Sequence, residues 1–399
     1  MTRQPIHTVY GGAHLFRANI AKKLGAAALD TLAAHAPDGQ AFAAALEWPV
    51  DLAVRIYPRI VEKLAREPVE DFRIDFEDGF GSRPDDEEDR YARRAAEEVA
   101  AGLAANSLPP AIGIRIKALS EASKRRSLRT LDLFLDHLWQ QTGALPQNFA
   151  ITLAKITGPD EVAELASACD AFERLHGLQA RALRLELMVE TPQSIFAPDG
   201  RIALPGLVSA GGGRVVGAHF GTYDYTASCD ITAAHQHMLH PSCDFAKHVM
   251  QVALAGSPVR LSDGATNVLP VGPRDAVHRA WRLHLQHIRH SLVSGFYQGW
   301  DLHPAQLPTR YAAVYAFFLE GLEPAAARLR NFIDKAAQAT LAGDVFDDAA
   351  TGQGLLNYFL RAVGCGAISE DEATGMSGLT LDELRSRSFA TILSKRASN

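Results

Sequence analysis

Residues 71–77 read Asp-Phe-Arg-Ile-Asp-Phe-Glu, and apolar and charged side chains alternate strictly along this stretch. Residues 112–117 and 183–190 largely repeat the alternation, with Ile-Gly-Ile-Arg-Ile-Lys and Leu-Arg-Leu-Glu-Leu-Met-Val-Glu. Successive side chains of a strand point to opposite faces, so each stretch predicts a strand with one apolar and one mostly charged face. This pattern decides the fold class, because a charged face must meet either water or opposite charges.

The segments between these strands indicate whether the sheet is antiparallel or parallel. Alternation by itself favours an antiparallel sheet with one solvent-exposed face. Each connection here is long enough for a helix and carries helical periodicity, which favours parallel βαβ units. We therefore predict an α/β fold, a (β/α)8 TIM barrel whose charged faces point inward and pair with one another. The expected strands lie near 8–10, 71–77, 112–117, 149–155, 183–190, 215–220, 259–262 and 295–302.

Strand signals stop after about residue 312, which sets the expected domain boundary. Residues 313–399 are rich in Ala and Leu at helical spacing, with expected breaks at Gly343, Gly352 and Gly364. We predict a catalytic barrel over residues 1–312 and a helical C-terminal extension over 313–399.

Composition excludes several classes of protein. The chain has 399 residues, 47% hydrophobic and 22% charged, with a formal net charge of −6 that gives no field for a nucleic-acid backbone. It holds no apolar run long enough to cross a membrane, and its four cysteines form no CxxC pair. The first residues do not resemble a signal peptide. We expect a cytoplasmic protein that binds neither nucleic acid nor membrane.

In a TIM barrel the functional groups stand at the C-terminal ends of the strands. Glu190 ends one predicted strand and Asp224 follows the next, which predicts a site for a hard cation such as Mg²⁺, with Mn²⁺ as a substitute. Arg115 is expected to clamp a substrate carboxylate through two parallel hydrogen bonds. Gly221 and Thr222, in the same turn as Asp224, are the other expected substrate contacts.

Six motifs along the barrel resemble, in the same order, those of one known family. That family is the citrate lyase beta-subunit family, which includes malyl-CoA lyases and related aldolases of the phosphoenolpyruvate/pyruvate barrel superfamily. The matching segments are Ile74-Asp75-Phe76-Glu77-Asp78, Ile114-Arg115-Ile116-Lys117, Leu153-Ala154-Lys155-Ile156, Val189-Glu190-Thr191-Pro192, Gly221-Thr222-Tyr223-Asp224-Tyr225 and Leu302-His303-Pro304-Ala305-Gln306.

The resemblance carries implications beyond the residue patterns. It implies a (β/α)8 barrel, Mg²⁺ on Glu190 and Asp224, Arg115 on a substrate carboxylate, and Glu77 and Asp78 as catalytic groups near metal-bound water. It also implies a homo-oligomer, either a trimer or a hexamer. The chain departs from the family after Glu190 and in its long N-terminal stretch through Trp48, so the substrate and its use of CoA do not transfer directly.

The hypothesis for function is an Mg²⁺-dependent carbon–carbon lyase or aldolase. It acts on a 2-oxo acid or hydroxy acid, or on the CoA thioester of one, through a metal-stabilised enolate. One alternative is a malate synthase-like or thioesterase-like enzyme that uses a CoA thioester. Another is a metal-binding barrel that serves as one subunit of a complex and depends on an acyl-carrier partner.

Several other residues allow a second interpretation. Lys155 falls on the apolar parity of its predicted strand, so either a bulge turns it into the site or its role is structural, and a Schiff base is a further alternative. His235, His237 and His240 suggest a metal site, but their spacing does not place all three on one helical face. A second group, His278, His284, His287 and His290, is interpreted as an exposed or interface face of one helix, with contact to an anion or phosphate as the alternative. His303 is interpreted either as a packing residue or as an active-site residue.

Overall fold

The computed structural model describes residues 3–334, 340–342, 345–347 and 349–397. Within these residues one eight-stranded sheet is found, and every hydrogen-bonded pair of its neighbouring strands is parallel. The parallel pairing confirms the predicted barrel class and excludes the antiparallel alternative. The strands are β1 (His7–Gly12), β2 (Asp71–Asp75), β3 (Ala111–Ile116), β4 (Phe149–Leu153), β5 (Arg184–Val189), β6 (Val215–Phe220), β7 (Arg260–Ser262) and β8 (Gly299–Asp301).

The strand order runs β7-β6-β5-β4-β3-β2-β1-β8, so β7 and β8 are the two edge strands. An isolated parallel bridge between Ala265 and Trp300 joins the two edges. The Trp300 N–H donates to the Gly264 carbonyl at 3.2 Å, and the Asp263 N–H donates to the Gln298 carbonyl at 2.8 Å. These bonds nearly close the barrel, as a (β/α)8 fold requires.

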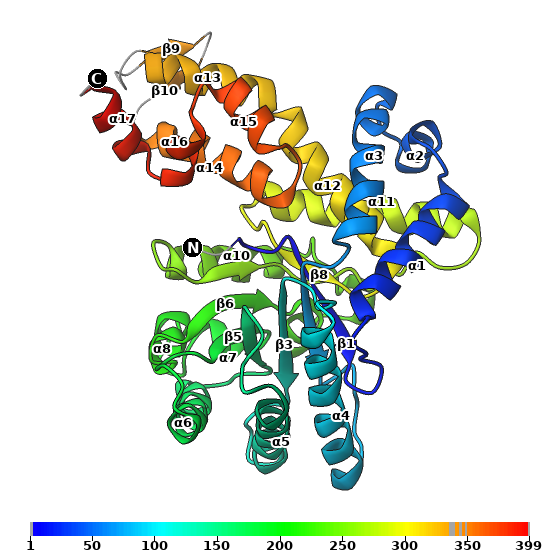
Figure 1. Ribbon diagram of the computed structural model, residues 1–399, viewed down its shortest axis with the longest axis vertical. Helices are drawn as coiled ribbons and strands as arrows, with labels where there is room; N and C mark the ends of the chain where they lie inside the picture. The colour runs from blue at the N-terminus through cyan, green and yellow to red at the C-terminus, as the bar shows by residue number, and fades with distance from the viewer. Residues whose placement is uncertain (1–2, 335–339, 343–344, 348, 398–399) are drawn as a thin grey trace. The chain divides into compact units, whose positions relative to one another are not determined.

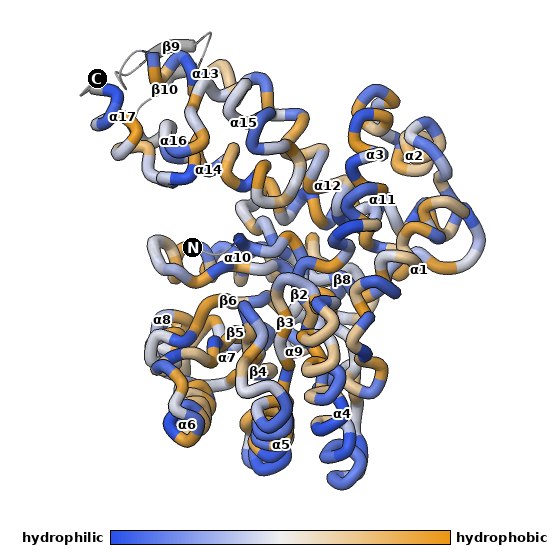
Figure 2. The backbone as a smooth tube through the Cα atoms, viewed as in Figure 1, coloured by the Kyte–Doolittle hydropathy of each residue, from blue (hydrophilic) through white to orange (hydrophobic). Residues whose placement is uncertain are grey.

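Helices follow the strands along the chain and cover the outside of the barrel. Figure 1 shows α4 and α5 side by side, and Figure 2 shows hydrophilic and hydrophobic residues interspersed along both, as expected for helices with one buried face. The helices of this unit are α1 (Ile20–His35), α4 (Asp85–Ala104), α5 (Lys124–Thr142), α6 (Pro159–His176), α7 (Pro192–Ile195), α8 (Leu204–Ala210), α9 (Thr222–Ser228), η1 (Ala233–His235), α10 (Pro241–Leu254), α11 (Arg274–Val293) and η2 (Pro304–Gln306).

The two faces of the strands separate as the alternation predicts. Ile74 and Ile114 are buried on the apolar parity. On the other parity Arg73 lies inside the barrel, 1% exposed, and its Nη2 donates to Glu186 Oε2 at 2.7 Å. Arg73 also donates from Nε to Thr152 at 3.1 Å and pairs with Asp71. The inward charges are therefore satisfied by one another, as a buried charge must be.

The chain divides into two compact units, and the division is less simple than one boundary at residue 312. The barrel unit comprises residues 5–37 and 64–310, and the second unit comprises residues 1–4, 38–63 and 311–399. Residues 38–63 join the second unit because Arg59 donates to Glu372 at 2.6 Å and to the Ala367 carbonyl at 2.6 Å.

The second unit is mostly helical, and it also contains a short antiparallel pair of strands, β9 (Thr340–Ala342) and β10 (Val345–Asp347), which the sequence did not predict. The expected breaks at Gly352 and Gly364 are wrong, because α14 runs through both, whereas Gly343 lies outside the described residues. The helices are α2 (Gly39–Leu46), α3 (Val50–Arg66), α12 (Leu307–Glu320), α13 (Leu322–Asp334), α14 (Ala349–Cys365), α15 (Glu370–Ser377), α16 (Leu381–Ser386) and α17 (Phe389–Ala397). In the described part of the chain, none of the helices has the length and apolar character needed to span a membrane.

Candidate active site

A cavity of about 340 Å³ opens at the C-terminal ends of the barrel strands. Residues from β1, β2, β3 and β8 and from the turns after β2, β5, β6 and β7 line it. Its charged and hydrogen-bonding lining residues include Asp75, Asp78, Arg115, Glu190, Thr222 and Asp224. Five of these six were named as site residues in the sequence analysis. Asp75 was not. This volume suits a small organic acid.

Glu190 and Asp224 form a pair of acids in the cavity wall. Glu190, directly after β5, is 1% exposed, and its Oε1 accepts the backbone N–H of Lys155 at 2.7 Å. Asp224 lies in the first turn of α9, directly after β6. Burial raises the pKa of Glu190 to about 7, with the charge of Asp224 adding to the rise against the lowering effect of Arg115. A carboxylate whose charge is disfavoured by burial and by a neighbouring acid is suited to take up a cation.

Gly221 permits this arrangement. A Cβ on Gly221 would lie 2.6 Å from Glu190 Oε2 and closer still to its Cβ, so any larger residue would displace the glutamate. The Gly221 N–H donates to the Val189 carbonyl at 3.0 Å and is thus engaged within the sheet. Thr222 is 2% exposed, and its Oγ1 has no hydrogen-bond partner among the described residues.

The chemistry of this donor set fits Mg²⁺, which usually takes one or two protein carboxylates and completes its shell with water and substrate oxygens. Over the described ranges, no group of three or more His, Cys, Asp or Glu side chains is arranged to hold a metal by itself. A cation held by Glu190 and Asp224 would therefore need further oxygen ligands besides these two carboxylates.

Arg115 lies beside the pair, but its predicted geometry needs correction. Its Nε and Nη2 donate to the two oxygens of Asp75 at 2.8 and 2.6 Å, so the side edge of the guanidinium already holds a carboxylate. Its Nη2 is also 3.5 Å from Glu77 Oε2. In the described part of the structure Nη1 has no recorded partner, which leaves the end of the guanidinium for a ligand. A two-bond clamp on substrate through the side edge is not available.

Asp75 is the residue that the sequence interpretation missed as part of the site. Besides holding Arg115, it accepts the backbone N–H groups of Glu77 at 2.9 Å and Gly79 at 2.7 Å. It thus fixes the turn after β2 and the arginine on β3 together. The inward parity of Asp75 was visible in the sequence, but parity does not tell which inward acid contacts which base.

Lys155 turns into the site because its backbone adopts φ +50°, a left-handed conformation that reverses the direction expected from β4. Its Nζ lies 2.5 Å from Glu77 Oε1, 3.0 Å from Asp78 Oδ2 and 3.4 Å from Asp224 Oδ2. Burial is the largest single effect and opposes its charge, but Glu77, Glu190 and Asp78 together outweigh burial and raise the pKa of Lys155 above its ordinary value. A lysine held protonated in this way is a poor Schiff-base nucleophile.

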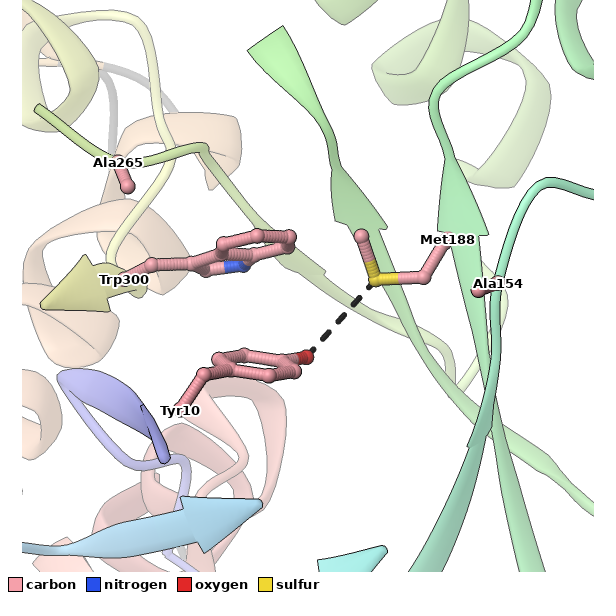
Figure 3. Close-up of a cluster of buried hydrophobic side chains, with 5 residues drawn as sticks. All are labelled: Tyr10, Ala154, Met188, Ala265 and Trp300. Carbon is pink, nitrogen blue, oxygen red and sulfur yellow. Dashed lines mark hydrogen bonds between the residues drawn. The ribbon is translucent and has the colours of Figure 1, made fainter. Parts of the chain in front are cut away.

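The floor of the cavity is aromatic. The rings of Trp300 of β8 and Tyr10 of β1 lie with their centroids 4.5 Å apart and their planes tilted by 31°, and Met188 of β5 reaches toward the Tyr10 hydroxyl (Figure 3). The Arg115 guanidinium lies 4.9 Å from the Tyr10 ring centroid. Within the described residues, Nε1 of the buried Trp300 has no hydrogen-bond partner. The floor therefore offers an apolar surface with one available donor.

The histidines singled out in the sequence lie apart from this cavity. His303 Nδ1 accepts the Ala305 N–H at 3.2 Å, and Gln306 accepts the N–H of His303 in return, so the His-Pro-x-Gln segment is a helix-capping motif. His284 and His287 of α11 are buried, which shows that their interpretation as an exposed face is wrong. His284 Nε2 lies 3.1 Å from Asp301 Oδ1 and thereby helps to satisfy a buried acid.

Solved structures with this barrel define the class of protein. A citrate lyase from Burkholderia xenovorans LB400 aligns with a TM-score of 0.59 at 21% identity, covering 80% of this chain and 91% of that one. CitE from Mycobacterium tuberculosis, solved with magnesium, acetoacetate and coenzyme A, aligns at 0.53 and 13%, covering 90% and 98%. A Haloferax volcanii malate synthase aligns at 0.51 and 14%, covering 96% and 99%. At these identities the likeness shows the fold, and the chain is a TIM-barrel protein with the architecture of the citrate lyase and malate synthase structures.

The particular family follows from the sequence match. The chain belongs to the family described as Domain of unknown function (DUF6986), whose model matches residues 1–392. A comparison with curated proteins found no match.

Proposed function

We propose that this protein is a divalent-cation-dependent carbon–carbon lyase or aldolase. Its substrate is a 2-oxo acid or hydroxy acid, free or as a CoA thioester. The observation that carries the proposal is the acid pair Glu190 and Asp224 beside Arg115 in one small cavity at the catalytic end of the barrel. The magnesium, acetoacetate and coenzyme A bound by the similar M. tuberculosis CitE support the same ligand chemistry.

Glu190 and Asp224 would hold Mg²⁺, with Mn²⁺ as a substitute. When bound, the ion supplies Lewis-acid stabilisation of the negative charge that develops on the substrate's oxo oxygen as the carbon–carbon bond breaks. The chain's own contribution is to fix the two acids: the Lys155 N–H orients Glu190, and the absence of a side chain at Gly221 leaves room for it.

Arg115 binds the substrate carboxylate through the open end of its guanidinium, because Asp75 holds the other edge rigid. Glu77 and Asp78 take different roles in this proposal. Burial raises the pKa of Glu77, which suits it to carry a proton to or from substrate. Burial opposes the charge of Asp78, but hydrogen bonding with the Glu77 carboxyl and with the Lys155 ammonium outweighs burial and lowers the pKa of Asp78, so it stays ionised.

A second candidate function is condensation or hydrolysis of a CoA thioester on the same site. The H. volcanii malate synthase, crystallised at 3 mM glyoxylate and matched over 96% of this chain, favours this candidate. Cleavage of a hydroxyacyl-CoA and condensation of acetyl-CoA with a 2-oxo acid are the two directions of one carbon–carbon bond change. They need the same cation and carboxylate contacts.

The test is an assay of the purified chain with Mg²⁺ on three substrate sets: oxaloacetate or pyruvate alone, a hydroxyacyl-CoA, and acetyl-CoA with glyoxylate. We expect turnover with at least one set, and a loss of about 10²- to 10⁴-fold in Glu190→Gln and Asp224→Asn. Glu164→Gln is the matched control, because this acid lies on α6 with Lys124 as its partner.

Undiminished turnover in either variant would rule out the cation site. Turnover that appears only when an acyl-carrier protein is added would instead favour the subunit alternative. Release of free CoA from acetyl-CoA and glyoxylate would select the synthase over the lyase, because reversal of the lyase reaction leaves the product as its CoA thioester.

A further inference from the structure

Lys155 is a positively charged group inside the acid cluster that the proposed function assigns to a divalent cation. Its ammonium contacts acids from two parts of the barrel: Glu77 and Asp78 after β2, and Asp224 after β6. The side chain is 33% exposed, and its ammonium is held by ion pairs with these acids.

The backbone makes this placement specific. A φ of +50° is uncommon for a residue with a side chain and is kept only where the surrounding contacts require it. The same residue donates its N–H to Glu190 at 2.7 Å. Lys155 therefore touches both members of the proposed cation-binding pair, one through its main chain and one through its ammonium.

We propose that Lys155 is a positioning residue that competes with the divalent cation for Asp224 and thereby limits the affinity of the site for the ion. The inference rests on the proposed function, because it needs a cation on Glu190 and Asp224. In this account Glu77 and Asp78 anchor the ammonium, and Asp224 is the partner that it shares with the ion.

The distances support competition over a purely structural salt bridge. The ammonium is 0.9 Å farther from Asp224 Oδ2, at 3.4 Å, than from Glu77 Oε1, at 2.5 Å, so Asp224 is the weaker of these partners. A divalent ion on the same carboxylate would lie a few ångströms from the ammonium. Even with screening close to that of water, a unit charge at such a separation changes the affinity for a divalent ion by about tenfold.

The substitution Lys155→Met removes the ammonium and retains the length of the side chain and the N–H that orients Glu190. We expect Mn²⁺ to bind this variant about tenfold more tightly than the wild type, and Mg²⁺ to show the same direction. The measurement is the free Mn²⁺ signal in an electron paramagnetic resonance titration of the full chain. Lys155→Arg, which keeps the charge, should stay within about threefold of the wild type.

Lys117→Met is the matched control. Lys117 also follows a barrel strand and also forms an ion pair, but its partners are Glu88 at 2.7 Å and the Phe76 carbonyl at 2.5 Å. Its removal should leave Mn²⁺ affinity unchanged. Thermal unfolding gives a second readout: in EDTA, Lys155→Met should melt below the wild type, and saturating Mn²⁺ should raise its Tm by more than it raises that of the wild type.

A variant that is merely damaged would bind the ion more weakly, so tighter binding is a result that a structural role does not produce. Equal or weaker Mn²⁺ binding in Lys155→Met would overturn the inference. If wild-type binding is lost in Asp224→Asn while Lys155→Met is unchanged, the proposed function stands and this inference fails. If the wild type binds no Mn²⁺, or binds it equally well without Asp224, both fail.

Discussion

Single residues in this site act through contacts that fix more than one neighbour. Asp75 holds the side edge of Arg115 and the N–H groups of Glu77 and Gly79, so one carboxylate sets both the arginine and the turn after β2. The position of the Glu190 side chain is fixed in turn by the hydrogen bond from the Lys155 N–H and by the space that Gly221 leaves for it. The catalytic end of the barrel is therefore preorganised by its own acids before any ligand binds.

The raised pKa of Glu190 predicts a pH dependence of cation binding. Its folded pKa of about 7 lies above the ordinary value of 4.5, so the folded chain without a cation gains stability from this group below pH 4.5 and loses it as the pH rises through 7. A cation needs the ionised form. We expect affinity for Mn²⁺ to rise about tenfold between pH 6 and pH 8, with one proton released per ion.

Titration calorimetry in buffers of different ionisation enthalpy measures that proton directly. The control is the same titration above pH 8, where Glu190 is already ionised and proton release should disappear. An affinity that is constant from pH 6 to pH 8 would contradict the assignment of Glu190 as a ligand.

How well the sequence predicts the site residues depends on the backbone conformation at each of them. The positions of Arg115 and Glu190 at the cavity were predictable, because each stands at or just after a strand end whose parity points into the barrel, and that of Asp224 because it lies in the turn after the next strand. Lys155 was not, because its left-handed φ reverses the parity that β4 implies, and alternation carries no signal for such a reversal. The partners of Asp75 were also hidden, since they depend on which strands are neighbours.

Among the elements, the strands combine an apolar face toward the helices with a charged interior that is internally paired. Arg73 of β2, Thr152 of β4 and Glu186 of β5 meet inside the barrel although they are far apart in the chain. His219 of β6 adds a contact to Glu186 at 3.3 Å. A core of this kind is sensitive to the loss of any one charge, because the partners left behind are buried.

Replacing Arg73 with Met tests this view of the core. The change keeps the volume similar but leaves Asp71 and Glu186 as uncompensated buried charges, so we expect a loss of about 3–5 kcal/mol in the free energy of unfolding. Urea denaturation followed by tryptophan fluorescence measures the loss. Arg184→Met, at the exposed start of β5, should change stability by less than about 0.5 kcal/mol. A small effect of Arg73→Met would mean that the interior is hydrated and the acids are solvated.

The prediction of elements from sequence was better for strands than for helix ends and faces. Strict alternation located β2, β3 and β5, because it follows directly from the pleat. The breaks expected in α14 were wrong because a glycine does not by itself end a helix; at Gly352 the space is also tight, since a Cβ there would lie 2.7 Å from the Phe332 ring. The buried histidines of α11 were misplaced because their partners, Asp301 for His284 and Thr266 for His287, come from other parts of the chain.

At the scale of the whole molecule the chain forms two units, and one of them is built from three segments. The short segment 38–63 was assigned to the barrel by its position in the sequence. Its helix α3 places Ala53, Ile56 and Ile60 on one buried face, which shows that it packs as an amphipathic helix. Periodicity predicts that such a face is covered, but it does not identify the covering segment.

We also expect the chain to assemble as a trimer or hexamer. The barrel unit exposes a stacked aromatic pair, Phe196 and Phe245, with centroids 6.1 Å apart and side chains 43% and 51% exposed. Exposed aromatic clusters of this kind mark interaction surfaces. Light scattering after size exclusion should therefore give three or six times the chain mass of 43.2 kDa. A mass of one chain at micromolar concentration would contradict this expectation, and Phe245→Asp should shift an oligomer toward it.

The proposed function depends most on a single cation shared by Glu190 and Asp224. The most direct measurement is the anomalous difference map of a crystal of the full chain soaked in Mn²⁺. We expect one strong peak within about 2.0–2.3 Å of a carboxylate oxygen of each acid, and we expect this peak to disappear in crystals of Asp224→Asn. A peak elsewhere in the barrel, or a peak that persists without Asp224, would contradict the proposed function.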